Sequence, residues 1–339
     1  MDGQRCPHHI TKWRRACKIL DLFCCPPCLP CMINKIAFHP PEPAYYKSVP
    51  IEPRASHALP EGRSRQMRMV LEDSTHTEVP ETHLYVDMKI GLCRTRRIAV
   101  TYWNLPQPSE LIILHSHVNA ADLGGIYDYM VYLRTRLRCE IVSYDYCGYG
   151  SSSGSASESN MLKACAEVLR YITETLKRPI SRVVLYGQSI GSVPTAYLAS
   201  IHKVAGVIFH SGLYSGVRLI CRERQEKCLS SCVDPFRNVD HITKIKSPVL
   251  FIHGSEDLVI PMSHAVDLSR LCETAVEPLW IHGGGHTGLE LKPSFIGKLR
   301  AFLEFVERQG TTRGPHSRGG KPLGSVRLLR SADKAVDVL

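Results

Sequence analysis

Residues 182–191 read RVVLYGQSIG, a β-branched run followed by the pattern Gly-x-Ser-x-Gly. The run predicts a buried strand and the residues after it predict a helix, so the glycines flank a sharp turn between the two. So tight a turn holds Ser189 in a strained backbone conformation, and side chains at Gly187 or Gly191 would clash with the strand and helix. The pattern therefore predicts a nucleophilic serine at the end of a strand, with the N–H of Ile190 directed at a developing oxyanion.

An acidic partner for Ser189 is expected in the turn that follows the predicted strand at 248–253. Residues 251–257 read FIHGSED and end that strand in polar residues. We take Asp257 as the acid, and its neighbour Glu256 is the main alternative. A carboxylate here would hold an imidazole in one tautomer and stabilise the imidazolium that forms during catalysis.

A histidine base is expected in the loop after the last predicted strand, where residues 280–286 read WIHGGGH. We assign the base to His286, because His282 lies too close to the end of the strand to reach a serine on a neighbouring one. His286 would remove the proton of Ser189 and later activate water. The order serine, acid, histidine along the chain is that of α/β-hydrolases.

The loop over residues 115–122, HSHVNAAD, follows another predicted strand and is the expected source of the second oxyanion donor. We expect this donor to be the backbone N–H of Val118 or Asn119. His115 and His117 are interpreted as hydrogen-bonded loop formers, since zinc would require a third ligand close by. No metal and no cofactor are expected.

From residue 83 onward, short β-branched runs alternate with helical patterns. We expect an α/β-hydrolase fold, with a mostly parallel central sheet, helices on both faces and a short lid near 212–240. The predicted strands are 83–90, 97–102, 111–115, 140–145, 182–186, 204–209, 248–253 and 276–281. The predicted helices are 123–137, 159–176, 190–200, 262–272 and 294–308.

Four segments are expected along the chain: a Cys-rich membrane-anchoring segment (1–40), a linker (41–82), the hydrolase domain (83–309) and a basic, mostly disordered tail (310–339). The 339 residues carry 42 Lys and Arg against 32 Asp and Glu, and the excess lies at the two ends. A nucleic-acid-binding domain would carry its charge on the folded surface. Basic ends instead suit an anionic surface such as the cytoplasmic leaflet of a membrane.

The N-terminal segment combines an amphipathic pattern with clustered cysteines. Apolar residues recur at helical spacing from 10 to 24, beside basic residues, which is typical of a helix lying in a membrane interface. The prolines of the run CCPPCLPC at 24–31 should end this helix. S-acylation is expected at Cys17, Cys24, Cys25, Cys28 and Cys31, because several acyl chains with basic residues anchor a protein firmly. A zinc site and unmodified thiols remain the alternatives. No secretory signal and no membrane-spanning helix are predicted.

Several motifs together resemble the alpha/beta-hydrolase-domain protein 17 family over about residues 17–306, the linker excepted. They are FCCPPC (23–28), KIAF (35–38), PPEP (40–43), NAADLG (119–124), SYDYCGYG (143–150), LYGQSIG (185–191) and AVEPLW (275–280). The resemblance implies a serine hydrolase that removes palmitate from cysteines of membrane-associated proteins. It also implies a palmitoylated Cys cluster, attachment to the cytoplasmic face of plasma and endosomal membranes, and a triad of Ser189, Asp257 and His286. No nucleic-acid partner is implied.

One departure from the family concerns Val118, which stands where the family has a glycine after histidine. A β-branched residue would be strained there if its φ were positive. A membrane-bound scaffold with a hydrolase fold and weak turnover therefore remains open. A lipid esterase that uses the same triad also remains open, since it would differ only in its acyl and leaving-group pockets.

Overall fold

The computed structural model describes residues 29–51, 65–71, 81–91, 94–220, 234–311 and 326–328. The chain divides into two units, Met1–His39 and Pro40–Leu339. In the first unit, one helix, α2 (Leu29–Ala37), is described. It contains Pro30 and begins within the run 24–31, whereas the predicted helix before this run lies outside the described residues. Pro30 lies in the first turn, where a helix needs no N–H donor.

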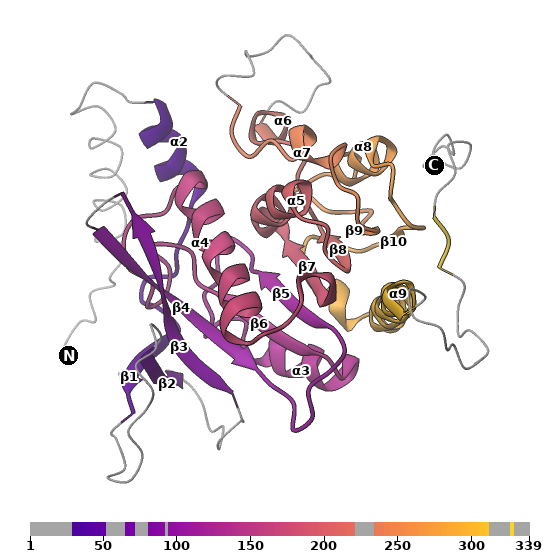
Figure 1. The fold of residues 1–339 in the computed structure, drawn as a ribbon. Coiled ribbons are helices and arrows are strands. Elements are labelled where there is room, and N and C mark those ends of the chain that lie inside the picture. Colours follow the sequence, from indigo (N-terminus) through magenta and orange to yellow (C-terminus); the bar gives the residue numbers. More distant parts are fainter. Residues whose placement is uncertain are drawn as a thin grey trace, which may run out of the picture. The chain divides into compact units, whose positions relative to one another are not determined.

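The second unit is built on one sheet with the strand order β1-β2-β3-β4-β6-β5-β7-β8-β9-β10 (Figure 1). Strands β6, β5, β7, β8, β9 and β10 are parallel, and the pairs from β1 to β4 and between β4 and β6 are antiparallel. The bounds are β1 Tyr46–Pro50, β2 Arg65–Leu71, β3 Thr82–Ile90, β4 Arg94–Trp103, β5 Ile112–Ser116, β6 Glu140–Tyr144, β7 Val183–Gln188, β8 Gly206–His210, β9 Val249–Gly254 and β10 Leu279–Ile281.

Helices cover both faces of this sheet, which confirms the α/β-hydrolase fold class predicted from the sequence. Their bounds are α3 Tyr127–Leu137, α4 Glu158–Arg170, α5 Ser192–Ile201, α6 Gly216–Ile220, α7 Val239–Ile242, α8 Ser263–Leu271 and α9 Pro293–Thr311. All the strands and long helices predicted from residue 83 onward are present, with shifts at their ends. The largest shift is in α4, which ends at Arg170 and continues as one π-helical turn, Tyr171–Thr175.

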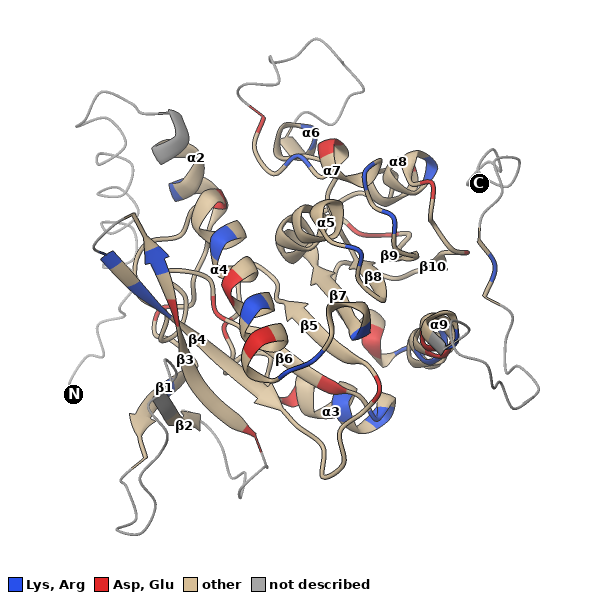
Figure 2. Cartoon of the chain, in the orientation of Figure 1, with Lys and Arg blue, Asp and Glu red and all other residues tan. Residues whose placement is uncertain are grey.

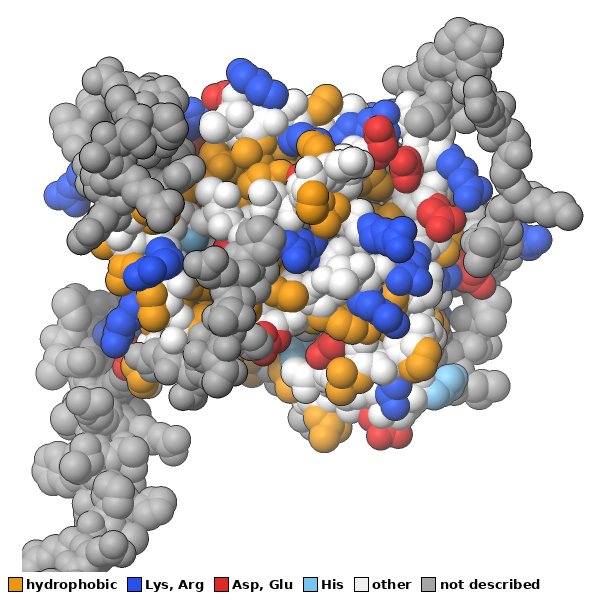
Figure 3. Space-filling view, turned by 90° about the horizontal axis from the view of Figure 1, so that it is seen from below, with side chains coloured by type: hydrophobic (Ala, Val, Ile, Leu, Met, Phe, Trp, Pro, Cys, Tyr) orange, Lys and Arg blue, Asp and Glu red, His pale blue; other side chains and the backbone are white. Residues whose placement is uncertain are grey.

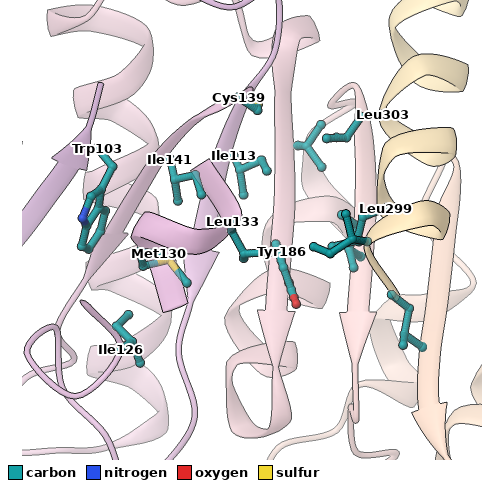
Figure 4. Packing of buried hydrophobic residues seen from close by; sticks show 14 of the residues in the cluster. Trp103, Ile113, Ile126, Met130, Leu133, Cys139, Ile141, Tyr186, Leu299 and Leu303 are labelled. Carbon is teal, nitrogen blue, oxygen red and sulfur yellow. The ribbon is translucent and has the colours of Figure 1, made fainter. Parts of the chain in front are cut away.

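The alternation of side chains along each strand distributes the core between two layers. Ile113 of β5 and Tyr186 of β7 belong to a cluster of buried residues with Met130 of α3 and Leu299 of α9 (Figure 4). Their strand neighbours point to the opposite face, because side chains alternate along a strand. Strands β5, β7, β8 and β9 contain no charged residue, and the charges of the unit lie mainly on helices and outer strands (Figure 2).

The predicted linker over 41–82 needs correction, because it contributes β1 and β2 to the sheet. Met67, Met69 and Leu71 alternate along β2 and pack against the core. This period of two is the signal of a half-buried strand, but the Pro, Ser and Glu around it obscured the pattern. Residues 52–64 and 72–80 of the predicted linker lie outside the described part of the chain.

Two other predicted segments are described only in part. Within the predicted lid at 212–240, α6 and α7 are helical, and residues 221–233 lie outside the described residues. Within the predicted tail, Leu328 forms an antiparallel bridge with Val276, and the N–H of Glu277 donates to Arg327 O at 2.9 Å. Arg327 and Leu328 of the tail are therefore paired with the domain.

On the face seen in Figure 3, Lys and Arg side chains lie beside Asp and Glu, with hydrophobic side chains exposed between them. Among the helices of the described residues, none is long and apolar enough to span a bilayer.

Candidate active site

Ser189 lies at a sharp turn between β7 and α5, as the Gly-x-Ser-x-Gly pattern predicts. Its φ is +55°, a left-handed value that is strained for a residue with a side chain. A Cβ on Gly187 would lie 2.4 Å from Gly191 O, and a Cβ on Gly191 would lie 2.0 Å from Ser116 O. Both positions therefore require glycine, and the loop after β5 rests directly against the turn that carries Ser189.

The structure brings Ser189, His286 and Asp257 into one hydrogen-bonded series. His286 Nε2 lies 3.0 Å from Ser189 Oγ, and His286 Nδ1 lies 2.7 Å from Asp257 Oδ2. Since a carboxylate only accepts, Nδ1 carries the proton and Nε2 is free to accept from the serine hydroxyl. This is the geometry in which an imidazole acts as general base toward a serine.

Asp257 is held by several donors besides His286. Its Oδ1 accepts the N–H of Val259 at 2.9 Å and of Ile260 at 2.8 Å. His253 Nε2 lies 3.1 Å from Oδ2, the oxygen that His286 also contacts. Burial alone would raise the pKa of Asp257, but the hydrogen bonds from His253, His286 and Ile260 outweigh it and hold the pKa well below 3.8. Asp257 is therefore ionised wherever His286 can act as a base.

The two alternatives from the sequence, Glu256 and His282, are both exposed and lie outside this series. The backbone N–H of Glu256 donates to Gly284 O at 2.8 Å, which ties the acid turn to the histidine loop. A Cβ on Gly254 would lie 2.2 Å from Gly284 O, so glycine at the end of β9 lets this loop approach. The close approach places His286 over Asp257.

The loop after β5 carries the expected oxyanion donors Val118 and Asn119. His117 Nδ1 donates to Val118 O at 2.7 Å, and Tyr146 Oη donates to His117 O at 2.5 Å. Val118 is not among the described residues with a positive φ, so the strain expected from its branched side chain does not arise. The third expected donor, Ile190, is in the first helical turn after Ser189, where N–H groups have no acceptor within the helix.

The histidines of this loop are buried and hydrogen-bonded, as interpreted from the sequence. His115 Nδ1 lies 3.1 Å from Ser143 Oγ, and burial lowers the pKa of His115 well below 6.5. In the described ranges, no group of three or more His, Cys, Asp and Glu side chains is arranged to hold a metal ion.

Of the predicted acylation sites, Cys17, Cys24, Cys25 and Cys28 lie outside the described residues, and Cys31 is described only as part of the backbone of α2.

Sequence reasoning missed His253 and Tyr146 as parts of this site. Each is a polar residue at or just after the carboxyl end of a buried strand, β9 or β6. This position could have indicated their role, because functional side chains of parallel sheets gather at the carboxyl ends of the strands.

Comparison with known proteins agrees with this geometry. A serine hydrolase family, described as Serine hydrolase (FSH1), matches residues 143–287. Alpha/beta hydrolase domain-containing protein 17C of Xenopus tropicalis is 37% identical over 83% of this chain and 92% of its own length. The chain belongs to the alpha/beta hydrolase domain-containing protein 17 family. The human 17B protein of this family is 38% identical, over 83% of this chain and 94% of its own.

Membership of this family makes the chain a serine hydrolase. Among solved structures, the esterase Pf2001 of Pyrococcus furiosus superposes with a TM-score of 0.54 at 14% identity, over 66% of this chain and 93% of the esterase. At that identity the likeness concerns the fold alone, and it agrees with the fold class described above.

Proposed function

We propose that the chain hydrolyses the S-palmitoyl thioesters of membrane-associated proteins through an acyl-enzyme on Ser189. The observation that carries the chemistry is the series Ser189–His286–Asp257, with contacts of 3.0 Å and 2.7 Å. The substrate class rests on the family and on the N-terminal cysteines, which suit a protein acting on acyl chains held in a membrane.

The reaction follows from the geometry. His286 Nε2 takes the hydroxyl proton as Ser189 Oγ attacks the acyl carbon, and Asp257 stabilises the imidazolium. The N–H of Ile190, with that of Val118 or Asn119, stabilises the oxyanion. The thiolate leaves readily, since thiols are far more acidic than alcohols, and it takes up the proton carried by the His286 imidazolium, which restores the neutral base. His286 then removes a proton from water, which attacks the acyl-enzyme and releases the fatty acid.

Membrane attachment is the second part of the proposal. Acylation of Cys17, Cys24, Cys25, Cys28 and Cys31, together with nearby basic residues, would hold the chain at the cytoplasmic face of plasma and endosomal membranes. Because the substrate acyl chain lies in the same bilayer, attachment raises the local concentration of enzyme around it without any new contact.

The first experiment tests the chemistry. A fluorophosphonate probe should label the wild-type chain and fail to label Ser189→Ala. The wild-type chain, not treated with the probe, is then assayed on a palmitoyl thioester and on the matched palmitoyl oxyester. A preference for the thioester supports the proposal, whereas a preference for glycerides or lysophospholipids would make the chain a lipid esterase. A folded chain with no labelling would indicate a scaffold.

The second experiment tests attachment. A variant with the five cysteines changed to serine should keep its activity on a soluble thioester and lose activity on palmitoylated proteins in membranes. Hydroxylamine-sensitive acyl labelling measures the acylation of the chain itself and that of its candidate substrates. It is compared between the wild type and Ser189→Ala. Equal loss on soluble and membrane-bound substrates would contradict the role given to the N-terminal segment.

A further inference from the structure

The strand β1 is linked through Asp145 to the loop that carries the oxyanion donors, although β1 lies at the outer edge of the sheet. Tyr46, the first residue of β1, is 2% exposed, and its hydroxyl donates to Asp145 Oδ2 at 2.5 Å. The same hydroxyl accepts the N–H of Ser151 at 3.2 Å. Gly150 makes room for this contact, because a Cβ there would lie 2.0 Å from Asp145 Oδ2 and 2.7 Å from the ring of Tyr46.

Asp145 in turn holds the loop after β5. Its Oδ1 accepts the N–H of Leu123 at 2.9 Å, and the ring of His117 packs beside it, with Nε2 at 3.5 Å and without a hydrogen bond. Both Asp145 and His117 are fully buried. Burial raises the pKa of Tyr46 well above 10, and the negative charge of Asp145 raises it further. The hydroxyl of Tyr46 therefore keeps its proton and donates it to Asp145.

The contacts of His117 decide where the oxyanion donors point. In a trans peptide the C=O and the N–H point in opposite directions. Tyr146 Oη binds His117 O and thereby sets the direction of the N–H of Val118. His117 Nδ1 binds Val118 O and thereby sets the direction of the N–H of Asn119. The orientation of the His117 ring is therefore coupled to the geometry of the oxyanion hole.

The residue before β1 binds the far end of the same loop. The N–H of Tyr45 donates to Asp122 Oδ2 at 2.9 Å, and Asp122 Oδ1 accepts the N–H of Gly125 at 2.9 Å. A Cβ on Gly124 would lie 2.9 Å from the carbonyl carbon of Tyr45, so the two backbones are in close contact. Tyr45 and Tyr46 thus contact the loop over residues 117–125 directly and through Asp145.

We propose that Tyr46 is a positioning residue for the oxyanion hole, acting through Asp145 on the loop after β5, which carries the peptide between Val118 and Asn119. The inference rests on the serine hydrolase mechanism proposed above. It gives a positioning role to the segment between the cysteine-rich N-terminus and the hydrolase core, since the Tyr46 hydroxyl contacts Asp145 and the N–H of Ser151.

The test compares two tyrosine hydroxyls that donate to buried carboxylates beside β6. Tyr46 binds Asp145 just after the end of β6, and Tyr102 binds Glu140 at its start. In the full-length chain, Tyr46→Phe should lower kcat on p-nitrophenyl butyrate about tenfold and change KM less than twofold, because an oxyanion hole acts on the transition state. The affinity for a boronic acid, which forms a tetrahedral adduct with serine, should fall by the same factor. Tyr102→Phe should leave all three quantities unchanged.

The outcomes separate the inference from the proposed function. An unchanged kcat in Tyr46→Phe overturns the inference, and so does an equal fall of kcat in both variants. If Tyr46→Phe does not fold, Asp145→Asn decides, because an amide has one acceptor oxygen for the hydroxyl of Tyr46 and the N–H of Leu123. That variant should also lose kcat at constant KM, and full activity in it would overturn the inference. A wild-type chain that neither turns over ester nor reacts with fluorophosphonate would instead refute the proposed function.

Discussion

His253 donates its Nε2 proton to the carbonyl of Ile260 at 2.8 Å and lies 3.1 Å from Asp257 Oδ2. Because a carbonyl only accepts, Nε2 must carry the proton, and the same proton is available to Asp257. His286 donates to this same oxygen at 2.7 Å. Asp257 Oδ2 therefore lies beside two imidazoles. That of His253 is buried, and that of His286 also contacts Ser189.

Loss of the His253 donor should impair catalysis without affecting substrate binding. We expect His253→Leu to lower kcat about tenfold, because Asp257 loses a hydrogen bond that stabilises its charge and fixes its orientation. His253→Gln, whose amide can donate from the position of Nε2, should recover most of this loss. Steady-state kinetics on a soluble ester measure both, and equal activity of the Leu and Gln variants would show that the donor is unimportant.

The adjacent acids Asp257 and Glu256 should differ sharply in importance. Asp257→Asn should lower kcat by about 10³ to 10⁴, because an amide can stabilise the wrong tautomer of His286. Glu256→Gln should remain close to wild type, since Glu256 is exposed and only its backbone N–H takes part in the site. A large loss in the Glu256 variant would contradict the contacts described here.

Substitution of Gly191 should disrupt the turn that presents Ser189. In Gly191→Ala the new Cβ would lie 2.0 Å from Ser116 O, so the loop and the turn must separate. We expect activity to fall more than about 100-fold and stability to fall by about 1–3 kcal/mol. Gly297→Ala in α9 is the control: its Cβ meets nothing within 4 Å, and alanine should stabilise the helix by up to about 1 kcal/mol. Urea unfolding and ester hydrolysis measure these effects.

The buried His83 should make stability depend on pH. It bridges Ser48 Oγ at 2.7 Å and Thr101 Oγ1 at 2.9 Å, and burial lowers its pKa from 6.5 to about 4. Between these values the unfolded chain binds a proton that the folded chain does not, so stability falls as pH falls from 6.5 to 4. The contribution is about 3 kcal/mol.

The matched variant for this prediction is His83→Gln, which does not titrate. Its unfolding free energy, measured in urea from pH 7 to pH 4, should decline less than that of the wild type. Burial also lowers the pKa of His264 to about 4 and that of His210 to about 3, so the remaining slope should keep the same sign. Parallel curves for the wild type and the variant would exclude His83 as the source.

Much of the domain was predictable from local patterns. The run before Gly187 predicts β7, the two glycines predict the strained turn at Ser189, and the alternation of strands and helices predicts the parallel part of the sheet. These features were accessible because they depend on neighbours in the chain. β1 and β2, on the antiparallel side of the sheet, were missed because turn-forming residues surround them.

The sequence by itself determined that a serine, an acid and a histidine follow one another at the ends of three strands, because that order and those residue types are local properties. Only the tertiary structure decided that Asp257 rather than Glu256 faces His286, that His253 shares the carboxylate, and that Tyr46 reaches Asp145. These are contacts between residues far apart in the chain. Their directions follow from how strands pair and loops pack, which no single stretch of sequence encodes.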